Sequence, residues 1–125
     1  MGGEPILIVD DNEINLKLAR VILVGEGYEV KTAGNAEEAL AVLADFRARL
    51  ILMDIQLPGM DGLTLTRQLR EDPAYDRVII VALTAYAMKG DEEKARAAGC
   101  DGYITKPIET DALPRTVAQF LATGR

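Results

Sequence analysis

The stretch LILMDIQLPGMDG, residues 50–62, places four large apolar residues directly before Asp54 and a Pro58-Gly59 turn. A continuous apolar run, in contrast to an alternating one, indicates a strand that is covered on both faces, as in parallel sheets. A carboxylate at the end of such a strand needs an explanation, because desolvation penalises its charge. Asp54 either turns into solvent there or has a binding or chemical role.

Four further apolar runs resemble this one and occur at intervals along the chain, at residues 5–9, 28–33, 78–83 and 102–105. Helical patterns separate them. Cap candidates begin these helices at Asp11-Asn12-Glu13, Asn35, Asp61 and Asp91, and a last helix is expected over residues 110–122. Strict alternation of strand and helix predicts an α/β fold, a doubly wound three-layer sandwich with right-handed crossovers.

Composition limits the function. The 125 residues suit one domain, 1–125, with a core over about 5–122. The net charge of −6 argues against a general nucleic-acid surface, and the absence of histidine excludes histidine catalysis and ligation. The single cysteine, Cys100, permits no internal disulfide and is expected to be a buried apolar residue. No long apolar segment suggests a signal peptide or membrane insertion, so we expect a soluble cytoplasmic protein.

Polar residues follow four of the five predicted strands. Ligands of such folds bind at the carboxyl ends of the strands, where the strand order reverses. The residues at these ends are Asp10 and Asp11 after the first strand, Asp54 after the third, Thr84 and Ala85 after the fourth, and Lys106 and Pro107 after the fifth. Three carboxylates, one hydroxyl and one ammonium are therefore expected at one edge of the sheet.

Three neighbouring carboxylates repel one another. At ~5 Å and an effective dielectric constant of ~20, each pair costs roughly 3 kcal/mol. A divalent cation could offset this charge, and all-oxygen ligands favour Mg²⁺ or Mn²⁺. The alternative is that Asp11 only caps the first helix and that the other acids are solvated.

Four segments together resemble the receiver domain of bacterial two-component response regulators: ILIVDDNEIN (6–15), LILMDIQLPGMDG (50–62), VIIVALTAYA (78–87) and GYITKPI (102–108). Residues 83–108 are most similar to single-domain regulators of the cell-fate type and to receivers of hybrid histidine kinases. The resemblance implies a flavodoxin-like (βα)5 sandwich with parallel strand order 2-1-3-4-5. It leaves open whether the chain stands alone or is a domain of a hybrid kinase.

The resemblance also implies a chemical site. Asp54 would be the phosphoacceptor, taking a phosphoryl group from a phosphohistidine of a histidine kinase or phosphotransfer protein. Asp11, Asp54 and the backbone carbonyl of Gln56 would bind Mg²⁺, and Asp10 would hold a metal-bound water. Lys106 would pair with Asp54 and then with the phosphoryl group.

A conformational switch is implied as well. Thr84 would donate its hydroxyl to the phosphoryl group, for which the small Ala85 leaves room. Tyr103 would turn inward and remodel the face of the fourth helix, fifth strand and fifth helix for a downstream protein target. Without the resemblance, Tyr103 is a strand-edge residue with a solvated hydroxyl.

Three features of the family are also expected here. Gln56 and Tyr86 would tune dephosphorylation, and the Lys106-Pro107 bond would be cis.

The first helix offers one inference of its own. Leu16, Ala19 and Leu23 fall opposite Ile14, Leu18 and Val21 on a helical wheel. We expect the first three to form an exposed apolar strip that docks the helical bundle presenting the phosphohistidine. Isolated exposed apolar residues are also normal, so the strip could have no partner.

Other functions fit the sequence less well. A Mg²⁺ phosphatase of the haloacid-dehalogenase type would need a second acid at position 56, where Gln56 stands. A nucleotide-binding sandwich would need a glycine-rich phosphate motif, which the sequence lacks. An inert pseudo-receiver would not need the complete set of site residues. We therefore expect a signalling module that is an enzyme only in its self-phosphorylation and self-dephosphorylation.

Overall fold

The computed structural model describes residues 3–85 and 90–124. Strands and helices alternate along the chain in the following order: β1 (Pro5–Val9), α1 (Glu13–Gly25), β2 (Glu29–Ala33), α2 (Ala36–Asp45), β3 (Leu50–Asp54), α3 (Gly62–Arg70), the short 3₁₀ helix η1 (Pro73–Tyr75), β4 (Ile79–Thr84), α4 (Asp91–Ala98), β5 (Gly102–Thr105) and α5 (Ala112–Thr123).

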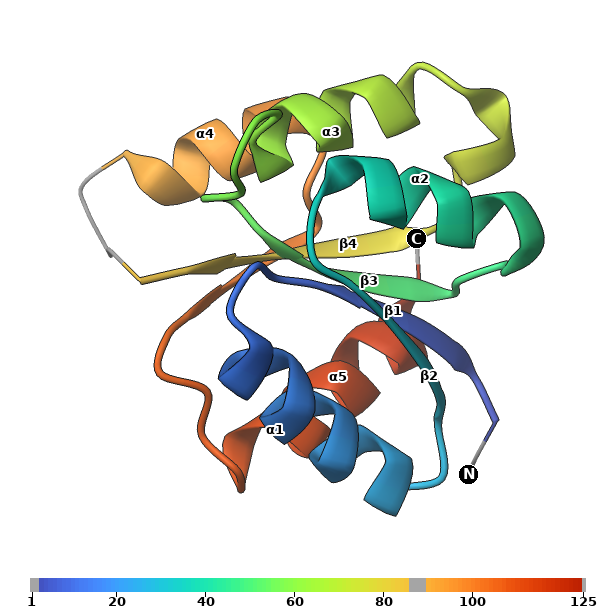
Figure 1. The fold of residues 1–125 in the computed structure, drawn as a ribbon, viewed down its shortest axis with the longest axis vertical. Coiled ribbons are helices and arrows are strands. Elements are labelled where there is room, and N and C mark those ends of the chain that lie inside the picture. Colours follow the sequence, from blue (N-terminus) through green and yellow to red (C-terminus); the bar gives the residue numbers. More distant parts are fainter. Residues whose placement is uncertain (1–2, 86–89, 125) are drawn as a thin grey trace.

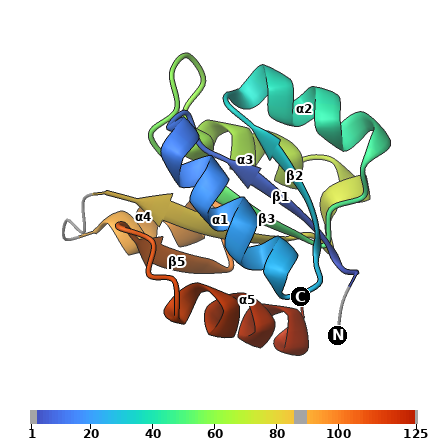
Figure 2. The same cartoon turned by 60° about the horizontal axis from the view of Figure 1, so that its bottom comes forward.

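The strands form one parallel sheet in the order β2-β1-β3-β4-β5, which confirms the predicted topology. Helices α1 and α5 cover one face, and α2, α3 and α4 cover the other (Figures 1 and 2). The strands end nearly in step, because Val9 pairs with Met53, Asp54 with Leu83, and Thr84 with Thr105. Residues that follow these ends are thereby brought to one edge of the sheet.

Each central strand contributes to two hydrophobic cores. In β1, Ile6 and Ile8 pack toward α1 and α5, whereas Leu7 and Val9 pack toward the opposite helices. All four are fully buried. Burial on both faces is the physical reason for the continuous apolar runs of the sequence.

Side-chain caps begin three helices as expected. Asn12, Asn35 and Asp61 each accept hydrogen bonds from backbone N–H groups of the first turn that follows. The predicted cap at Asp91 is wrong. Gly90, with φ of +91°, stands before α4, and Asp91 lies in the first turn of that helix.

The predicted docking strip on α1 is also wrong. Ala19 and Leu23 are fully buried, and Leu16 packs partly buried against the core between the sheet and α5. The exposed apolar side chains of this helix are Ile14, Val21 and Val24. Because α1 is apolar around much of its circumference, spacing alone could not identify the inner face. The face with the small Ala19 packs against the sheet.

Among the described residues, every helix is too short or too polar to pass through a lipid bilayer.

Candidate functional site

Three aspartates meet at the carboxyl edge of the sheet. Asp10 and Asp11 follow β1, and Asp54 is the last residue of β3. One carboxylate oxygen from each lies within 4.8 Å of the others. Asp10 and Asp54 are buried, with 0% and 2% of their surface exposed, whereas Asp11 is exposed. The oxygens are therefore close enough for one cation to contact them together.

Lys106 supplies the positive charge of the site. Its Nζ lies 2.9 Å from Oδ2 of Asp10 and donates a hydrogen bond of 3.0 Å to Oδ2 of Asp54. Its backbone N–H donates to the carbonyl of Thr84 over 2.6 Å, which ties the end of β5 to the end of β4. The Lys106-Pro107 bond is cis, as expected.

Backbone donors orient the two buried carboxylates. The N–H of Gln56 donates to Oδ1 of Asp54 over 2.8 Å, and the N–H of Asn12 donates to Oδ1 of Asp10 over 2.9 Å. The second oxygen of each carboxylate, Oδ2, is thereby directed toward Lys106.

Gly62 is a positioning residue that the sequence analysis missed. A Cβ atom at this position would overlap the backbone carbonyl of Asp54, so only glycine allows α3 to begin so close to the end of β3. The signal was present in the sequence. A glycine follows the Asp61 cap, where a residue with better helix propensity would otherwise be favoured.

Burial and charge act in opposite directions on the ionisable groups. Burial raises the pKa of Asp54 above its ordinary value. The hydrogen bonds from Gln56 and Lys106 oppose this shift, and the charge of Asp10 adds to it. For Lys106, burial alone would lower the pKa, but the hydrogen bonds and charges of Asp10 and Asp54 raise it. One ammonium therefore does not fully compensate the carboxylates.

The acidic cluster fits a hard divalent cation. Oδ2 of Asp10 is buried and lies 2.9 Å from the ammonium of Lys106, so two buried carboxylates share one ammonium. The atoms available as metal ligands at the site are carboxylate and carbonyl oxygens, which Mg²⁺ and Mn²⁺ prefer. Both the excess negative charge and the oxygen ligands of the site are those that such an ion requires.

Thr84 and Tyr103 lie on the neighbouring strands β4 and β5, two positions apart in register. Thr84 is buried at the end of β4, and its side chain hydrogen-bonds with the hydroxyl of Tyr103. Burial raises the pKa of Tyr103, with a further contribution from Asp91. The Tyr103 ring packs partly buried against the core below α4, so its hydroxyl is not simply solvated at a strand edge.

Among the other predicted site residues, Ala85 and Gln56 are exposed beside the cluster. Tyr86 lies outside the described residues.

Comparison with known proteins agrees with this geometry. Residues 6–118 match the family model of the response regulator receiver domain. The polar-differentiation response regulator DivK of Brucella anthropi is 44% identical over 116 residues, which are 93% of this chain and 94% of the relative.

Solved structures share the fold. A CheY-like receiver domain protein from Methanospirillum hungatei superposes with a TM-score of 0.89 at 33% identity, covering 98% of this chain and 96% of that one. The receiver domain of a sensor histidine kinase from Pseudomonas aeruginosa has a TM-score of 0.86 at 35% identity, covering 97% and 99%. That structure holds a magnesium ion in its active-site cleft. Sequence, fold and the acidic edge of the sheet thus agree that this chain belongs to the response regulator receiver domain family.

Proposed function

We propose that the chain is the phosphoacceptor module of a two-component phosphorelay. In this proposal Asp54 takes a phosphoryl group from a phosphohistidine of a histidine kinase or a histidine phosphotransfer protein. The observation that carries it is the burial of Asp54 at the sheet edge, with two further aspartates and the Lys106 ammonium in contact distance.

The transfer is a displacement at phosphorus. A carboxylate oxygen of Asp54 forms the new O–P bond while the P–N bond of the phosphohistidine breaks, and the electron pair of that bond returns to the imidazole nitrogen. The attacking group must be ionised, and Lys106 favours this state by lowering the pKa of Asp54 against the effect of burial. The N–H of Gln56 holds Oδ1 and so fixes the orientation of the carboxylate.

In the proposed site Asp11, Asp54 and the backbone carbonyl of Gln56 would hold Mg²⁺, or Mn²⁺ in its place, and Asp10 would hold it through a water. When bound, the ion offsets the charge of the carboxylates, so that an anionic phosphoryl group can approach one of them. The two buried carboxylates that share the Lys106 ammonium, with Asp11 beside them, support this assignment.

The phosphoryl group then has further partners on the protein. Lys106 contacts a phosphoryl oxygen as a point charge, and Thr84 donates its hydroxyl to another. Ala85 leaves room for the group. Because Thr84 shares a hydrogen bond with Tyr103, movement of Thr84 toward the phosphate would change the contacts of the tyrosine.

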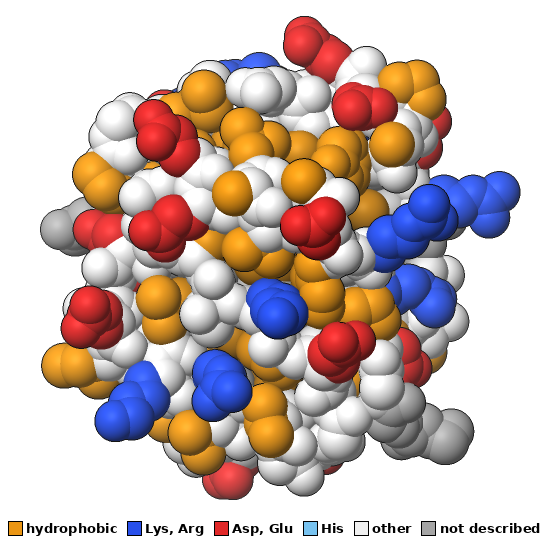
Figure 3. Space-filling model, turned by 45° about the vertical axis from the view of Figure 1, so that its right-hand side comes forward, with side chains coloured by type: hydrophobic (Ala, Val, Ile, Leu, Met, Phe, Trp, Pro, Cys, Tyr) orange, Lys and Arg blue, Asp and Glu red, His pale blue; other side chains and the backbone are white. Residues whose placement is uncertain are grey.

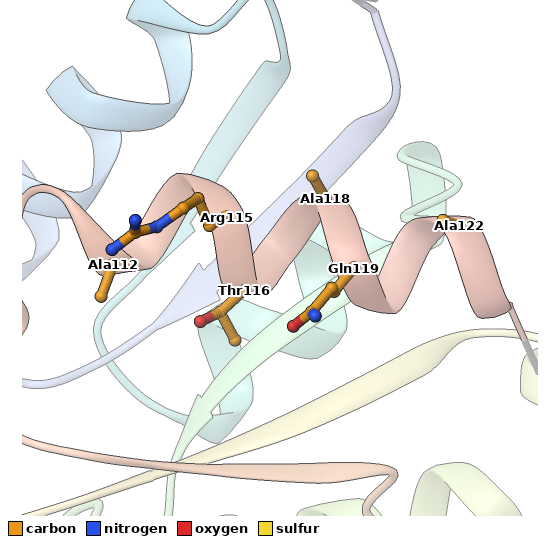
Figure 4. Close-up of a pocket in the computed structure, with 6 residues that line it drawn as sticks. All are labelled: Ala112, Arg115, Thr116, Ala118, Gln119 and Ala122. Atoms are coloured by element: carbon orange, nitrogen blue, oxygen red, sulfur yellow. The ribbon is translucent and has the colours of Figure 1, made fainter.

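The surface formed by α4, β5 and α5 is the proposed output face. Tyr103 lies on β5 beside α4, and α5 presents a shallow hollow of about 640 Å³ lined partly by Ala112, Ala118 and Ala122 (Figure 4). A change at Tyr103 would alter this face and its affinity for a downstream protein target.

We propose a switch and not a turnover enzyme. Phosphorylation and the slower loss of phosphate to water would both occur on Asp54, with Gln56 and Tyr86 at positions that tune the loss.

The phosphohistidine partner would contact the outer side of α1. This surface, which we call the α1 patch, consists of Ile14, Val21 and Val24, with 77%, 61% and 47% of their surfaces exposed. Ile14→Glu with Val21→Glu should slow transfer from a phosphorylated bundle and leave phosphorylation by acetyl phosphate unchanged. Equal transfer rates would remove the α1 patch from the proposal.

The proposal treats residues 5–122 as one receiver unit whose partners are proteins. The net charge of −6 supports proteins over nucleic acid as partners. Because histidine kinases use ATP inside the cell, the proposal carries the expectation of a cytoplasmic location without membrane insertion.

Intact-mass measurement tests the proposal. Incubation with acetyl phosphate and Mg²⁺ should add one phosphoryl group, and chelation of the metal or Asp54→Asn should abolish the addition. Asp61→Asn is the matched control, because Asp61 is an exposed helix cap for which asparagine is equally suitable. Unchanged phosphorylation of the Asp54→Asn variant would contradict the proposal.

A further inference from the structure

A second charged cluster lies at the opposite edge of the sheet, where the strands begin. Arg47, Arg49 and Arg77 line one pocket of about 600 Å³, which we call the arginine pocket. The residues that line it include no aspartate or glutamate, although the chain carries a net charge of −6. Figure 3 turns this side of Figure 1 forward and shows Lys and Arg side chains there among hydrophobic ones, with Asp and Glu side chains on the same face. The arginine pocket is therefore locally basic on an acidic protein.

The backbone beneath the arginine pocket is fixed by the sheet. The N–H of Arg49 donates to the carbonyl of Pro5 over 2.7 Å, and the carbonyl of Arg49 accepts from Ile79 over 3.0 Å. Ala48 and Val78, next to the arginines in sequence, are buried. The three side chains thus extend from a rigid base, which reduces the entropy lost when they bind a ligand.

The three guanidinium groups are not neutralised within the part of the chain that the structure describes. Three other cations of the described residues do have carboxylate partners: Arg70 pairs with Asp101, Arg96 with Glu92, and Lys106 with Asp10 and Asp54. Among residues 3–85 and 90–124, Arg47, Arg49 and Arg77 form no such pair. Asp45 and Asp76, which are close to them in sequence, do not line the pocket.

We infer that the arginine pocket binds a nucleoside polyphosphate. Guanidinium groups form bidentate hydrogen bonds with phosphates and stack on planar rings, so three of them can serve both parts of such a ligand. Pro5, Ala74 and Val78 add apolar surface for the base and sugar. The volume lies within the range of small-molecule sites, roughly 300–1,000 Å³.

Recognition would depend on side chains and not on a glycine-rich loop. The concave shape, built by loops before β1, β3 and β4 together with the end of α5, favours a compact ligand over an extended acidic peptide. The β3 strand of five residues separates this pocket from Asp54, a span of roughly 17 Å. The inference is therefore independent of the proposed phosphorylation.

Calorimetric titration with ATP, GTP and pyrophosphate tests the inference. The buffer contains EDTA, which keeps the acidic site free of metal. The triple variant Arg47→Ala/Arg49→Ala/Arg77→Ala should bind the nucleotides at least about tenfold more weakly than the wild type, because each arginine removed loses charge-assisted hydrogen bonds. The control variant Lys17→Ala/Arg20→Ala/Arg115→Ala removes the same charge from exposed positions on α1 and α5 and should bind within about twofold of the wild type.

Amide chemical shifts locate the site in the same samples. ATP should shift the amides of residues 47–49, 74, 77–78 and 123–124 and leave those of residues 10–12 and 54–56 unchanged. Absence of saturable binding, an equal loss in the control variant, or shifts at the acidic edge alone would overturn the inference. Binding of an acidic peptide such as polyglutamate without binding of ATP or GTP would also overturn it and would assign the pocket to a protein partner.

Discussion

Asp54→Asn should stabilise the protein when no divalent cation is present. Burial raises the pKa of Asp54, so folding disfavours its ionised form. A raised carboxyl pKa means that the folded state binds the proton more tightly. Below the ordinary carboxyl pKa of about 4, Asp54 makes its full contribution to the free energy of unfolding. This contribution is lost as the pH rises through the pKa that Asp54 has in the folded state. At neutral pH the wild type has incurred this loss, whereas asparagine has no charge to bury.

The distances give the magnitude. At an effective dielectric constant of ~20, losing the 3.0 Å contact with Lys106 removes an attraction of about 5.5 kcal/mol. Removing repulsion from Asp10 and Asp11, whose oxygens lie within 4.8 Å, returns at least about 3.5 kcal/mol for each before screening. The exposed Asp11 is screened, which reduces its share, whereas relief from burying the charge adds to the gain. We expect a net stabilisation of about 1–2 kcal/mol.

Urea unfolding followed by circular dichroism measures this effect. In EDTA at pH 7 the variant should have the higher midpoint at an unchanged slope, and the gain should shrink as the pH falls toward the ordinary carboxyl pKa. Free Mg²⁺ at about ten times its Kd adds about 1.4 kcal/mol to the wild type, so the difference should shrink when the ion is added. Asp61→Asn should change stability by less than about 0.5 kcal/mol. A destabilised Asp54→Asn protein in EDTA would refute the reasoning, because Lys106 would then more than compensate the repulsion.

Three further predictions concern the frame around the site. Gly62→Ala should destabilise the fold by about 1–3 kcal/mol and weaken Mg²⁺ binding, because the added Cβ would overlap the Asp54 carbonyl. Urea unfolding and Mg²⁺ titration measure both effects, and Gly25→Ala is the control because the space around Gly25 is open. Arg70→Met should lower the free energy of unfolding by about 3 kcal/mol, because it leaves the half-buried Asp101 without its cation. Arg96→Met, in an exposed pair, should lower it by less than about 1 kcal/mol, and equal losses in thermal unfolding would contradict this reasoning. Cys100 is buried, and burial raises the pKa of its thiol. Alkylation by iodoacetamide at pH 8 should therefore be far slower in the native protein than in urea, and similar rates would mean that the thiol is accessible.

Much of the fold could be predicted because the two-sided burial of a parallel sheet leaves a direct mark on the sequence. The strands Pro5–Val9 and Gly102–Thr105 have the predicted bounds. The convergence of Asp10, Asp11, Asp54 and Lys106 followed from topology alone, since parallel strands end at the same edge.

The orientation of α1 could not be predicted in this way. The helix is apolar on both sides, and tertiary packing selects the face with Ala19 and Leu23. The glycine after the Asp61 cap signalled an unusual position, but the approach of Gly62 to the Asp54 carbonyl and the arginine pocket depend on how closely separate segments approach in space. Spacing along one element carries no information about such distances.

The most direct test of the central claim identifies the phosphorylated atom. Borohydride reduces an aspartyl phosphate to homoserine, so the protein treated with acetyl phosphate and Mg²⁺ can be reduced, digested and sequenced by tandem mass spectrometry. The account predicts homoserine at position 54 and at no other aspartate, and none when EDTA replaces Mg²⁺. Homoserine at position 10 or 11, or its absence from a sample that has gained a phosphoryl group, would contradict it.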